Sequence, residues 1–385
     1  MHVLYLIDSL SGGGAEQSLA ALASPLVSSG MVLDVAYLKD TEGMQNRLKE
    51  AGANLYSLAQ GGGSRRAWVK STRALLERRR PDLLHTTLFE SDIAGRIAAM
   101  RTEIPVVTSL VNVTYGPEQF ADPRLKAWRL RGAQVVDLVT ARRVARWHAI
   151  SGHVADVMAG RLRIPRARID VIPRGRDPQS LGVRSEERRA CTRATLGIGD
   201  DQPLVLAAAR QEHQKGLDVL IESWPEVLST HPSARLLIAG REGNQSWLLN
   251  ARLDETGTRS SIALLGSRAD VSDLLCATDA FVMPSRWEGL GSVLLEAMAL
   301  EAPIVASDLP AVREIVEHGR TATLVPREHP RALATAISDL LSDPGGARKR
   351  SAAAHAEFLA FYTIDRIARQ TADFYRCVAG APAPS

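Results

Sequence analysis

The stretch "AFVMPSRWEGLGSVLLEAMA", residues 280 to 299, runs from a short apolar segment through a loop into the start of a helix. Two glycines free the loop backbone, and Ser292 can cap the helix, which places Glu296 in its first turns. Glu288 then lies on the loop, beside helix N–H groups that favour an anion. The stretch therefore predicts a phosphate held by the backbone, with hydroxylated groups held by the two carboxylates.

Apolar runs like the one that opens this stretch recur along the chain and alternate with segments of helical period. In the first half they are "HVLYLI", "VLDVAYL", "NLYSL", "DLLHT", "PVVTSL" and "RWHAI"; in the second half they are "LVLAAA", "ARLLIAG", "IALLG", "AFVMPS" and "PIVAS". Continuous apolar strands separated by helices are typical of parallel sheets covered on both faces. The class predicted is doubly wound α/β.

The pattern starts afresh near residue 203, which predicts two Rossmann-like domains facing each other across a cleft. We place the hinge near Pro173 to Asp177, with an N-terminal domain at 1–175 and a C-terminal domain at 176–351. A last helix at 352–378 is expected to complete the N-terminal domain, and the tail at 379–385 to be disordered. Ligands of such sheets bind at the carboxyl ends of the strands, so the cleft is the expected site.

The composition is that of a soluble globular protein, with 45% apolar and 23% charged residues. No apolar run is long enough to span a bilayer, and the first residues lack the basic start of a secretory signal. The three cysteines are far apart and fit neither a disulfide framework nor a zinc site. A cytoplasmic location is therefore expected.

Charge is unevenly placed along the chain. Residues 63–176 contain 22 Lys and Arg against 10 Asp and Glu, a local excess of +12 in a chain of net charge +4. This excess indicates either a solvated basic face or a surface for an anionic membrane or acidic acceptor, with peripheral contact at the inner face of the membrane. We expect no nucleic-acid partner, because no recognition motif accompanies the charge.

The basic region contains a candidate helix, "RLKAWRLRGAQVVDLVTARR", at residues 124–143. Five apolar residues can line one side of it, while three arginines lie elsewhere on the helix: Leu125, Trp128, Val135, Leu138 and Val139, and Arg124, Arg131 and Arg142. Either the apolar side faces a membrane, or it packs on the domain core while the arginines are solvated. Both interpretations predict a helix.

Two further loops follow predicted strands and suit a phosphate. "SGGGAEQ" places Gly13 and Gly14 before a helix, where backbone N–H groups can approach an anion, although a tight structural turn explains it equally well. "ARQEHQKG" places Arg210 and Lys215 on a strand-to-helix loop, where two cations suit a diphosphate and solvated surface charges are the alternative.

Together these motifs make the chain resemble the retaining glycosyltransferases of the GT-B fold, in family 4 of the sequence-based classification, also called the glycosyltransferase group 1 type. The similar motifs cover nearly the whole chain and include "GGGAEQ", "HAISGHVAD", "RQEHQKGLDVLIES" and "AVREIV". The most specific of them is the E-x7-E pair of Glu288 and Glu296 in its "PS…EG.G…LEAM" setting. The R-x4-K pair ahead of a glycine adds to it.

The resemblance implies roles for residues on both halves of the chain. Gly13 and Gly14 would lie near the donor phosphates, and Arg210 and Lys215 would bind the diphosphate. Glu296 would hold the ribose hydroxyls, and Glu288 the donor sugar. Arg268 would flank the base, and the backbone of Gly289, Leu290, Gly291 and Ser292 would lie near the β-phosphate and the sugar.

His85 is the remaining candidate for catalysis beside Glu288, Arg210 and Lys215. The family often has His-x-His after the fourth strand, with the second histidine contacting the reacting sugar, but this chain has Thr87 at that second place. A core or loop role for His85 therefore stays open. Arg174 and Arg176 also depart from the family pattern and favour either an anionic ligand or the hinge itself.

The function implied is a retaining transfer of a sugar from a nucleotide-diphosphate donor, with a UDP-sugar expected first and a GDP-sugar next. The acceptor is a hydroxyl of a glycan, a lipid-linked molecule or a small molecule. Neither a metal nor another cofactor is expected, and the chain has no D-x-D. The alternative is a non-catalytic nucleotide-sugar-binding partner subunit. A dehydrogenase is not favoured, because G-x-G-x-x-G is absent.

Overall fold

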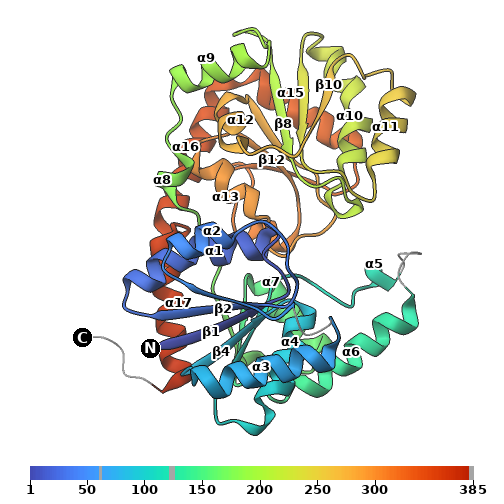
Figure 1. Ribbon diagram of the computed structural model, residues 1–385. Helices are drawn as coiled ribbons and strands as arrows, with labels where there is room; N and C mark the ends of the chain where they lie inside the picture. The colour runs from blue at the N-terminus through green and yellow to red at the C-terminus, as the bar shows by residue number, and fades with distance from the viewer. Residues whose placement is uncertain (60–62, 121–125, 381–385) are drawn as a thin grey trace. The chain divides into compact units, whose positions relative to one another are not determined.

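The computed structural model describes residues 1–59, 63–120 and 126–380, and within these ranges the chain forms two compact units. Unit 1 contains residues 1–175 and the segment from Ile364 onward, and unit 2 contains residues 176–363. Each unit is built on one parallel sheet, as the continuous apolar runs predict (Figure 1).

The sheet of unit 1 has seven strands in the order β3-β2-β1-β4-β5-β6-β7. Its strands are β1 (His2–Ile7), β2 (Val32–Tyr37), β3 (Asn54–Ser57), β4 (Leu83–Thr87), β5 (Val106–Leu110), β6 (Arg146–Ala149) and β7 (Ile169–Val171). Its helices are α1 (Gly14–Ser28), α2 (Gln45–Glu50), α3 (Arg65–Arg79), α4 (Phe89–Ala98), α5 (Pro117–Phe120), α6 (Ala127–Ala141), α7 (Gly152–Arg161) and α17 (Ile364–Ala379), with short 3-10 turns η2 (Ala99–Arg101) and η3 (Arg166–Arg168).

Helices cover both faces of the unit 1 sheet (Figure 1). On one face α1 and α17 pack against β1, burying Leu19 and Tyr375 among the strand side chains. On the other face α3 and α4 pack, with Trp68 and Ala94 buried. Continuous apolar strands such as β1 are stable only between two such layers, which explains the absence of polar alternation in their sequence.

The sheet of unit 2 has six strands in the order β10-β9-β8-β11-β12-β13. Its strands are β8 (Leu204–Ala208), β9 (Arg235–Ala239), β10 (Ile262–Gly266), β11 (Ala280–Met283), β12 (Ile304–Ser307) and β13 (Thr323–Val325). Its helices are α8 (Pro178–Leu181), α9 (Glu186–Thr195), α10 (Leu217–Thr230), α11 (Ser246–Glu255), α12 (Val271–Ala277), α13 (Ser292–Ala299), α14 (Pro310–Arg313), α15 (Pro330–Ser342) and α16 (Pro344–Phe361), with the 3-10 turn η4 (His213–Lys215).

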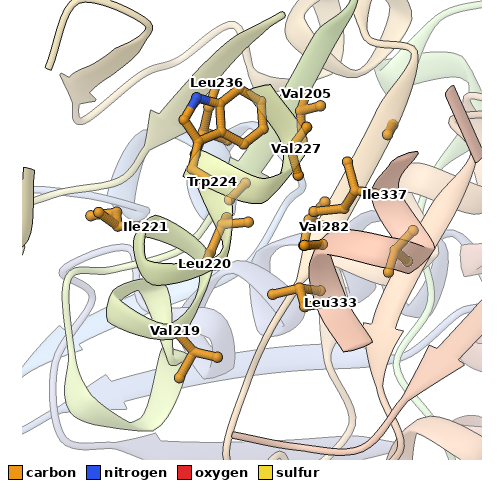
Figure 2. Close-up of a cluster of buried hydrophobic side chains, with 14 of the residues drawn as sticks. Val205, Val219, Leu220, Ile221, Trp224, Val227, Leu236, Val282, Leu333 and Ile337 are labelled. Carbon is orange, nitrogen blue, oxygen red and sulfur yellow. The ribbon is translucent and has the colours of Figure 1, made fainter. Parts of the chain in front are cut away.

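The core of unit 2 lies between this sheet and the helices α10 and α15. Trp224 of α10 is fully buried, and its indole N–H donates to Ser261 Oγ at 3.0 Å. Figure 2 shows Trp224 near Leu236 and Val227, with Leu333 and Ile337 of α15 beside Val282. Burial of one such aromatic ring removes a large apolar area from water while its single polar atom keeps a partner.

All the predicted strands are present, and β7 and β13 are the two that the sequence analysis did not predict. Each has only three residues and forms an edge of its sheet. An apolar run of three residues is too short to stand out from a loop by its pattern.

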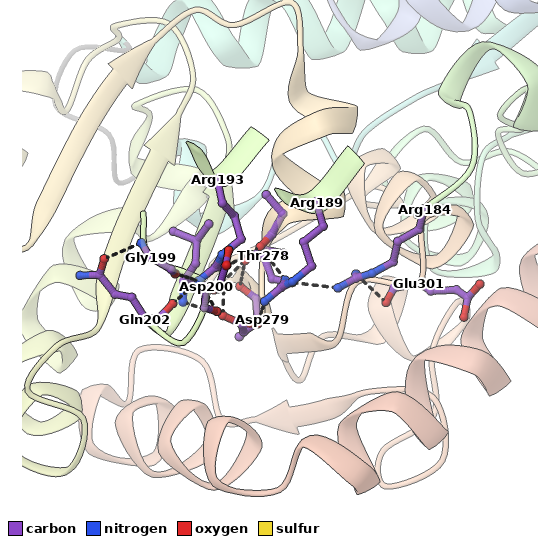
Figure 3. Close-up of polar contacts among 12 residues, drawn as sticks. Arg184, Arg189, Arg193, Gly199, Asp200, Gln202, Thr278, Asp279 and Glu301 are labelled. Carbon is purple, nitrogen blue, oxygen red and sulfur yellow. Dashed lines mark hydrogen bonds and ion pairs between the residues drawn. The ribbon is translucent and has the colours of Figure 1, made fainter. Parts of the chain in front are cut away.

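The polar stretch after the hinge is folded onto unit 2 through arginines of α9 and the turn before it. Arg193, 1% exposed, donates to the carbonyls of Ala277 and Gly199 at 2.9 and 2.6 Å. Arg189 pairs with Asp279 at 2.6 Å, and Arg184 donates to the carbonyl of Glu301 at 3.0 Å (Figure 3). The many charges of this stretch therefore satisfy backbone carbonyls at loop ends rather than mark a flexible connection.

The single C-terminal helix predicted at 352–378 is wrong, because the structure has two helices there. α16 ends at Phe361 and α17 begins at Ile364, and only α17 belongs to unit 1. Thr363 lies between them and forms an isolated bridge with Arg176, so the helix is interrupted where the chain leaves unit 2. The tail expected at 379–385 lies mostly outside the described residues, which end at Gly380.

Across the described ranges, every helix is either too short or too polar to traverse a bilayer.

Candidate functional site

The strand order reverses at one place in each sheet, between β1 and β4 in unit 1 and between β8 and β11 in unit 2. In each sheet, the loops that follow the two strands at this reversal lead to opposite faces of the sheet and leave room for a ligand between them. In unit 2 they are the loops at residues 209–216 and 284–291, which carry six of the predicted site residues. We take this switch point of unit 2 as the candidate site.

The two loops of the unit 2 switch point are in close backbone contact. A Cβ on Gly216 would lie 2.1 Å from the carbonyl oxygen of Pro284, and Gly216 has a φ of +60°. Gln214 Nε2 donates to the Trp287 carbonyl at 2.9 Å, and the Arg286 N–H donates to the Gln214 carbonyl at 2.8 Å. Only glycine permits this approach, because any side chain at 216 would separate the loops.

A buried arginine braces the same two loops. Arg286, 8% exposed, donates twice to Asp218 at 2.9 and 2.7 Å and also to Glu328 at 2.9 Å. Burial alone would raise the pKa of Asp218, but the bonds from Arg286 outweigh it and the net pKa is lowered. This pair, which was not among the residues predicted from the sequence, fixes the loop that carries Glu288 to the start of α10.

Lys215 and Glu288 come together at this point. Lys215 Nζ donates to Glu288 Oε1 at 2.6 Å, and Ser285 Oγ donates to the same oxygen at 2.7 Å. Glu288 is 6% exposed, whereas the Lys215 side chain is 19% exposed. Among the described residues no hydrogen bond engages Glu288 Oε2, so this oxygen can accept from a ligand hydroxyl while Oε1 stays paired.

Glu296 has a cationic partner as well. Arg176 Nε donates to Glu296 Oε1 at 2.7 Å, with the side chains 11% and 20% exposed. The Arg176 backbone N–H donates to the carbonyl of Tyr362, so this arginine stands where the chain enters and leaves unit 2. From the sequence, Arg176 favours either an anionic ligand or the hinge, and in the structure its partner is a protein carboxylate.

The start of α13 differs from the prediction by one residue. The helix begins at Ser292, and its N-cap is Gly291, with a φ of +81° and no side-chain hydrogen bond. Ser292 is therefore not the cap, because the left-handed conformation needed before the helix belongs to the glycine. The loop backbone is tightly held, since Gly289, Leu290 and Gly291 are all buried.

The other two cations predicted in unit 2 lie on neighbouring loops. Arg210 follows β8, and its side chain is exposed. Arg268 follows β10 and donates to both carboxylate oxygens of Asp270 at 2.8 and 2.6 Å. The bond from Arg268 lowers the pKa of Asp270. Arg268 can still flank a ligand through the face of its guanidinium or through Nη1, which neither of these two bonds uses.

In unit 1 the glycine loop leads into α1 as predicted, but its helix N-terminus contains a buried acid. Glu16, 6% exposed, accepts from Ser9 Oγ at 3.2 Å and lies against Gly13. A Cβ on Gly14 would lie 2.8 Å from Arg174 Nη1. Glu16 offsets the positive end of the helix, so a phosphate at Gly13 and Gly14 would depend on the nearby Arg174 for charge.

His85 lies on β4 in a buried chain of neutral partners. It is 3% exposed, and its ring nitrogens contact Tyr375 Oη at 2.5 Å and Ser109 Oγ at 2.7 Å. Ser109 also contacts His148 Nδ1 at 2.8 Å. Burial, with the neighbouring His148, lowers the pKa of His85 well below its ordinary value. These contacts occupy both ring nitrogens within unit 1.

Two protein families match the chain, one on each unit. The family described as Glycosyltransferase Family 4 matches residues 12–180, and the family described as Glycosyl transferases group 1 matches residues 202–343. The second match contains the whole switch point of unit 2 described above.

Three curated proteins illustrate the similarity in sequence. An uncharacterized glycosyltransferase of Methanocaldococcus jannaschii is 30% identical over 55% of each chain. The alpha-D-kanosaminyltransferase of Streptomyces kanamyceticus is 28% identical over 67% of this chain and 65% of its own length. The 2-deoxystreptamine N-acetyl-D-glucosaminyltransferase of Streptomyces fradiae is 28% identical over 99% of this chain and 90% of its own. The chain thus spans about half to two thirds of the first two relatives.

Solved structures show the same architecture over the whole chain. A crystal structure of HepE from Anabaena in complex with UDP and glucose has a TM-score of 0.86 at 22% identity, covering 98% of this chain and all of its own. Sucrose-phosphate synthase from Thermosynechococcus elongatus has a TM-score of 0.85 at 21% identity, covering 99% of this chain and all of its own. The two Rossmann-like units are those of the GT-B fold.

Proposed function

The chain belongs to the group 1, family 4 glycosyltransferases, and on that premise we propose that it transfers a sugar from a nucleotide-diphosphate donor to a hydroxyl acceptor with retention of configuration. The observation that carries the proposal is the contact between Lys215 and Glu288 at the switch point of unit 2. It brings a cation suited to phosphate and a carboxylate suited to hydroxyls onto two interlocked loops.

The proposed chemistry asks the protein for charge stabilisation and positioning. The bond between the anomeric carbon and the diphosphate oxygen breaks, and the acceptor hydroxyl forms the new bond on the same face of the sugar. The leaving phosphate takes the hydroxyl proton. Lys215 and Arg210 balance the charge that develops on the diphosphate, and Glu288 holds a sugar hydroxyl through the oxygen that Lys215 leaves unpaired.

Glu296 is proposed to hold the ribose of the donor. Its carboxylate is oriented by Arg176 through Oε1, which leaves a second oxygen for a diol. The backbone of Gly289, Leu290, Gly291 and Ser292 is proposed to lie near the phosphates and sugar, and Arg268 near the base. Gly13 and Gly14 of unit 1, with Arg174 beside them, are proposed to be phosphate-binding residues.

A UDP-sugar is the first donor proposed, and a GDP-sugar the second. A UDP-bound neighbour of the same fold supports the first choice. The acceptor class is a hydroxyl of a glycan, a lipid-linked molecule or a small molecule. One relative, the 2-deoxystreptamine N-acetyl-D-glucosaminyltransferase, is named for a small molecule. No metal is proposed at the phosphates, because two cations serve that charge; activity should then survive excess EDTA.

A donor panel tests the proposal directly. UDP-, GDP- and dTDP-sugars are screened by thermal shift, and the binding donors are then offered acceptors of the three classes. Product mass identifies the transferred sugar, and the proton coupling at its anomeric carbon shows whether configuration is retained. An inverted product, or activity abolished by EDTA and restored by Mg²⁺ or Mn²⁺, would contradict the mechanism.

A second candidate function is a non-catalytic nucleotide-sugar-binding subunit. It is favoured by Thr87, which replaces the family's second histidine, and by the enclosed position of His85. Single-turnover experiments with a radiolabelled donor separate the two. An enzyme forms labelled product or hydrolysed sugar, whereas a binding subunit retains intact donor at saturation.

A further inference from the structure

The helix α6 has its polar side inward and its apolar side outward, the reverse of an ordinary surface helix. Trp128, Val135, Val136 and Val139 are 68%, 57%, 37% and 56% exposed. These four residues follow one another at helical spacing along a single strip, which we call the outer face of α6. Gly132, which is also exposed, lies within the strip.

The opposite side of α6 is fixed to unit 1 by buried polar contacts. Asp137 accepts from Arg96 Nη1 at 2.5 Å and from Tyr115 Oη at 2.9 Å, and Arg96 also reaches Thr140 at 3.3 Å. Arg96 is 1% exposed and stacks on the Trp147 ring at 4.8 Å. Rotating the helix to bury its valines would remove both partners of Asp137 and would take Asp137 and Thr140 away from Arg96, which is strongly unfavourable for buried charges. The valines therefore stay outward.

Exposed cations accompany the outer face of α6. Arg129 and Arg131 lie on the helix, Lys126 and Arg142 lie at its two ends, and all four are exposed. The only acid of α6, Asp137, points inward to Arg96. The surface is thus apolar in the middle and positive at its margins. Leu125 and Arg124, which the sequence analysis placed on this helix, lie outside the described residues, and Leu138 is half-buried.

From this arrangement we infer that the outer face of α6 docks on an anionic lipid bilayer. Tryptophan and valine enter the headgroup region, and the flanking arginines and lysine meet acidic headgroups. A water-soluble protein partner would suit the apolar strip, but its positive margins, with no exposed acid among the residues of α6, favour a surface of uniform negative charge. The alternative in which Trp128 packs on the domain core is excluded by its exposure.

Vesicle co-sedimentation tests the inference without any need for transferase activity, so its outcome is independent of the proposed function. The intact protein should sediment with mixed phosphatidylcholine–phosphatidylglycerol vesicles, stay in solution with phosphatidylcholine alone, and dissociate as salt rises. Each of Arg129→Gln and Arg131→Gln should weaken partitioning by about five-fold. Trp128→Ser with Val135→Ser should weaken it further, with an unchanged melting temperature because both side chains are already exposed.

Trp247→Ser is the matched control. Trp247 lies on α11 of unit 2 and is 70% exposed, so it resembles Trp128 in type and exposure but lies on another surface. Its replacement should leave sedimentation unchanged. No binding to anionic vesicles at low salt, equal binding by the Trp128 and Trp247 variants, or equal binding to neutral vesicles would overturn the inference. So would a dimer that light scattering detects in solution and that Trp128→Ser dissociates.

Discussion

The two switch points of the molecule share one topology but differ in what holds their polar residues. In unit 2, Glu288 and Glu296 are each held by a cation, Lys215 and Arg176. In unit 1, the corresponding strand β4 carries His85 in a chain of hydroxyls and imidazoles. Burial raises the pKa of Tyr5 to about 12, so the groups around His85 stay neutral.

This difference indicates which groups can take up a ligand beside the partner that they already have. A partly exposed cation paired with one carboxylate oxygen can also contact a phosphate, while the other carboxylate oxygen accepts a hydroxyl, so little charge is left uncompensated. A buried neutral chain has no such freedom, since a broken bond leaves a polar atom without a partner. We therefore expect substitutions in unit 2 to affect catalysis and those around His85 to affect stability.

The largest effect is expected for Lys215→Ala. The loss of a charge-assisted contact to the diphosphate should cost about 2–4 kcal/mol of transition-state stabilisation, or about 30- to 1,000-fold in kcat/KM. Lys349→Ala, an exposed lysine of α16, is the control and should be neutral. An unchanged kcat/KM in Lys215→Ala would show that Lys215 does not stabilise the transition state.

Arg176→Ala is expected to act on donor binding. Loss of one charged hydrogen bond that orients Glu296 should cost about 1.5–3 kcal/mol, expressed mainly in the KM for the donor. Arg176→Lys should recover part of it, because the charge remains without the directed Nε–H bond. Arg313→Ala breaks an exposed ion pair with Asp308 and serves as control. If Arg176→Ala and Arg313→Ala changed the KM for the donor equally, Arg176 would have no specific role in donor binding.

Gly216→Ala separates backbone strain from loop contact. The new Cβ collides with Pro284 O, so the two loops must part, with an expected loss of about 1–3 kcal/mol of stability and a weaker Lys215–Glu288 pair. Gly197→Ala is matched, since Gly197 has a φ of +66° but no atom within 4 Å of the added Cβ. Similar melting temperatures and donor KM for both variants would show that the loop contact is unimportant.

The smallest effect on activity is expected in unit 1, where the test is the pH dependence of stability. Burial lowers the pKa of both His85 and His148, so below about pH 6.5 the unfolded chain binds protons that the folded chain does not. Stability is therefore fully present above that pH and falls below it, by up to about 1.4 kcal/mol per pH unit for each histidine. His85→Asn should flatten the decline of melting temperature between pH 6.5 and 5 while kcat at neutral pH changes little. A large fall in kcat at unchanged stability would instead make His85 catalytic.

Strands, the doubly wound class and the loop positions of Lys215 and Glu288 were accessible from the sequence, because apolar period and loop chemistry are local. The cationic partners of Glu288 and Glu296 could not be predicted from the sequence. Lys215 and Glu288 lie 73 residues apart, and Arg176 and Glu296 lie 120 apart. The first pair forms because the strand order places β8 beside β11, so that the loops after these strands meet. The second pair joins Arg176, at the start of unit 2, to helix α13.

The orientation of α6 shows a second limit of sequence pattern. The spacing of Trp128, Val135 and Val139 correctly predicts one apolar side, but periodicity cannot tell which side faces the core. That choice depends on Arg96, a residue of another helix, whose buried guanidinium requires Asp137 inward. A single distant partner thus reverses the ordinary rule that the apolar side is buried.

Helix α17 completes the core of unit 1, although the whole of unit 2 lies before it in the sequence. This order has a consequence for folding during synthesis. Residues 176–363 leave the ribosome before α17 does, so unit 2 can fold while unit 1 still lacks its final layer. Until then the apolar face that α17 will cover has no Ile367, Phe374 or Tyr375 against it, and His85 lacks the hydroxyl of Tyr375. Unit 1 becomes complete only after α17 has been synthesised, and a chain truncated before residue 364 would contain a folded unit 2 joined to an incomplete, aggregation-prone unit 1.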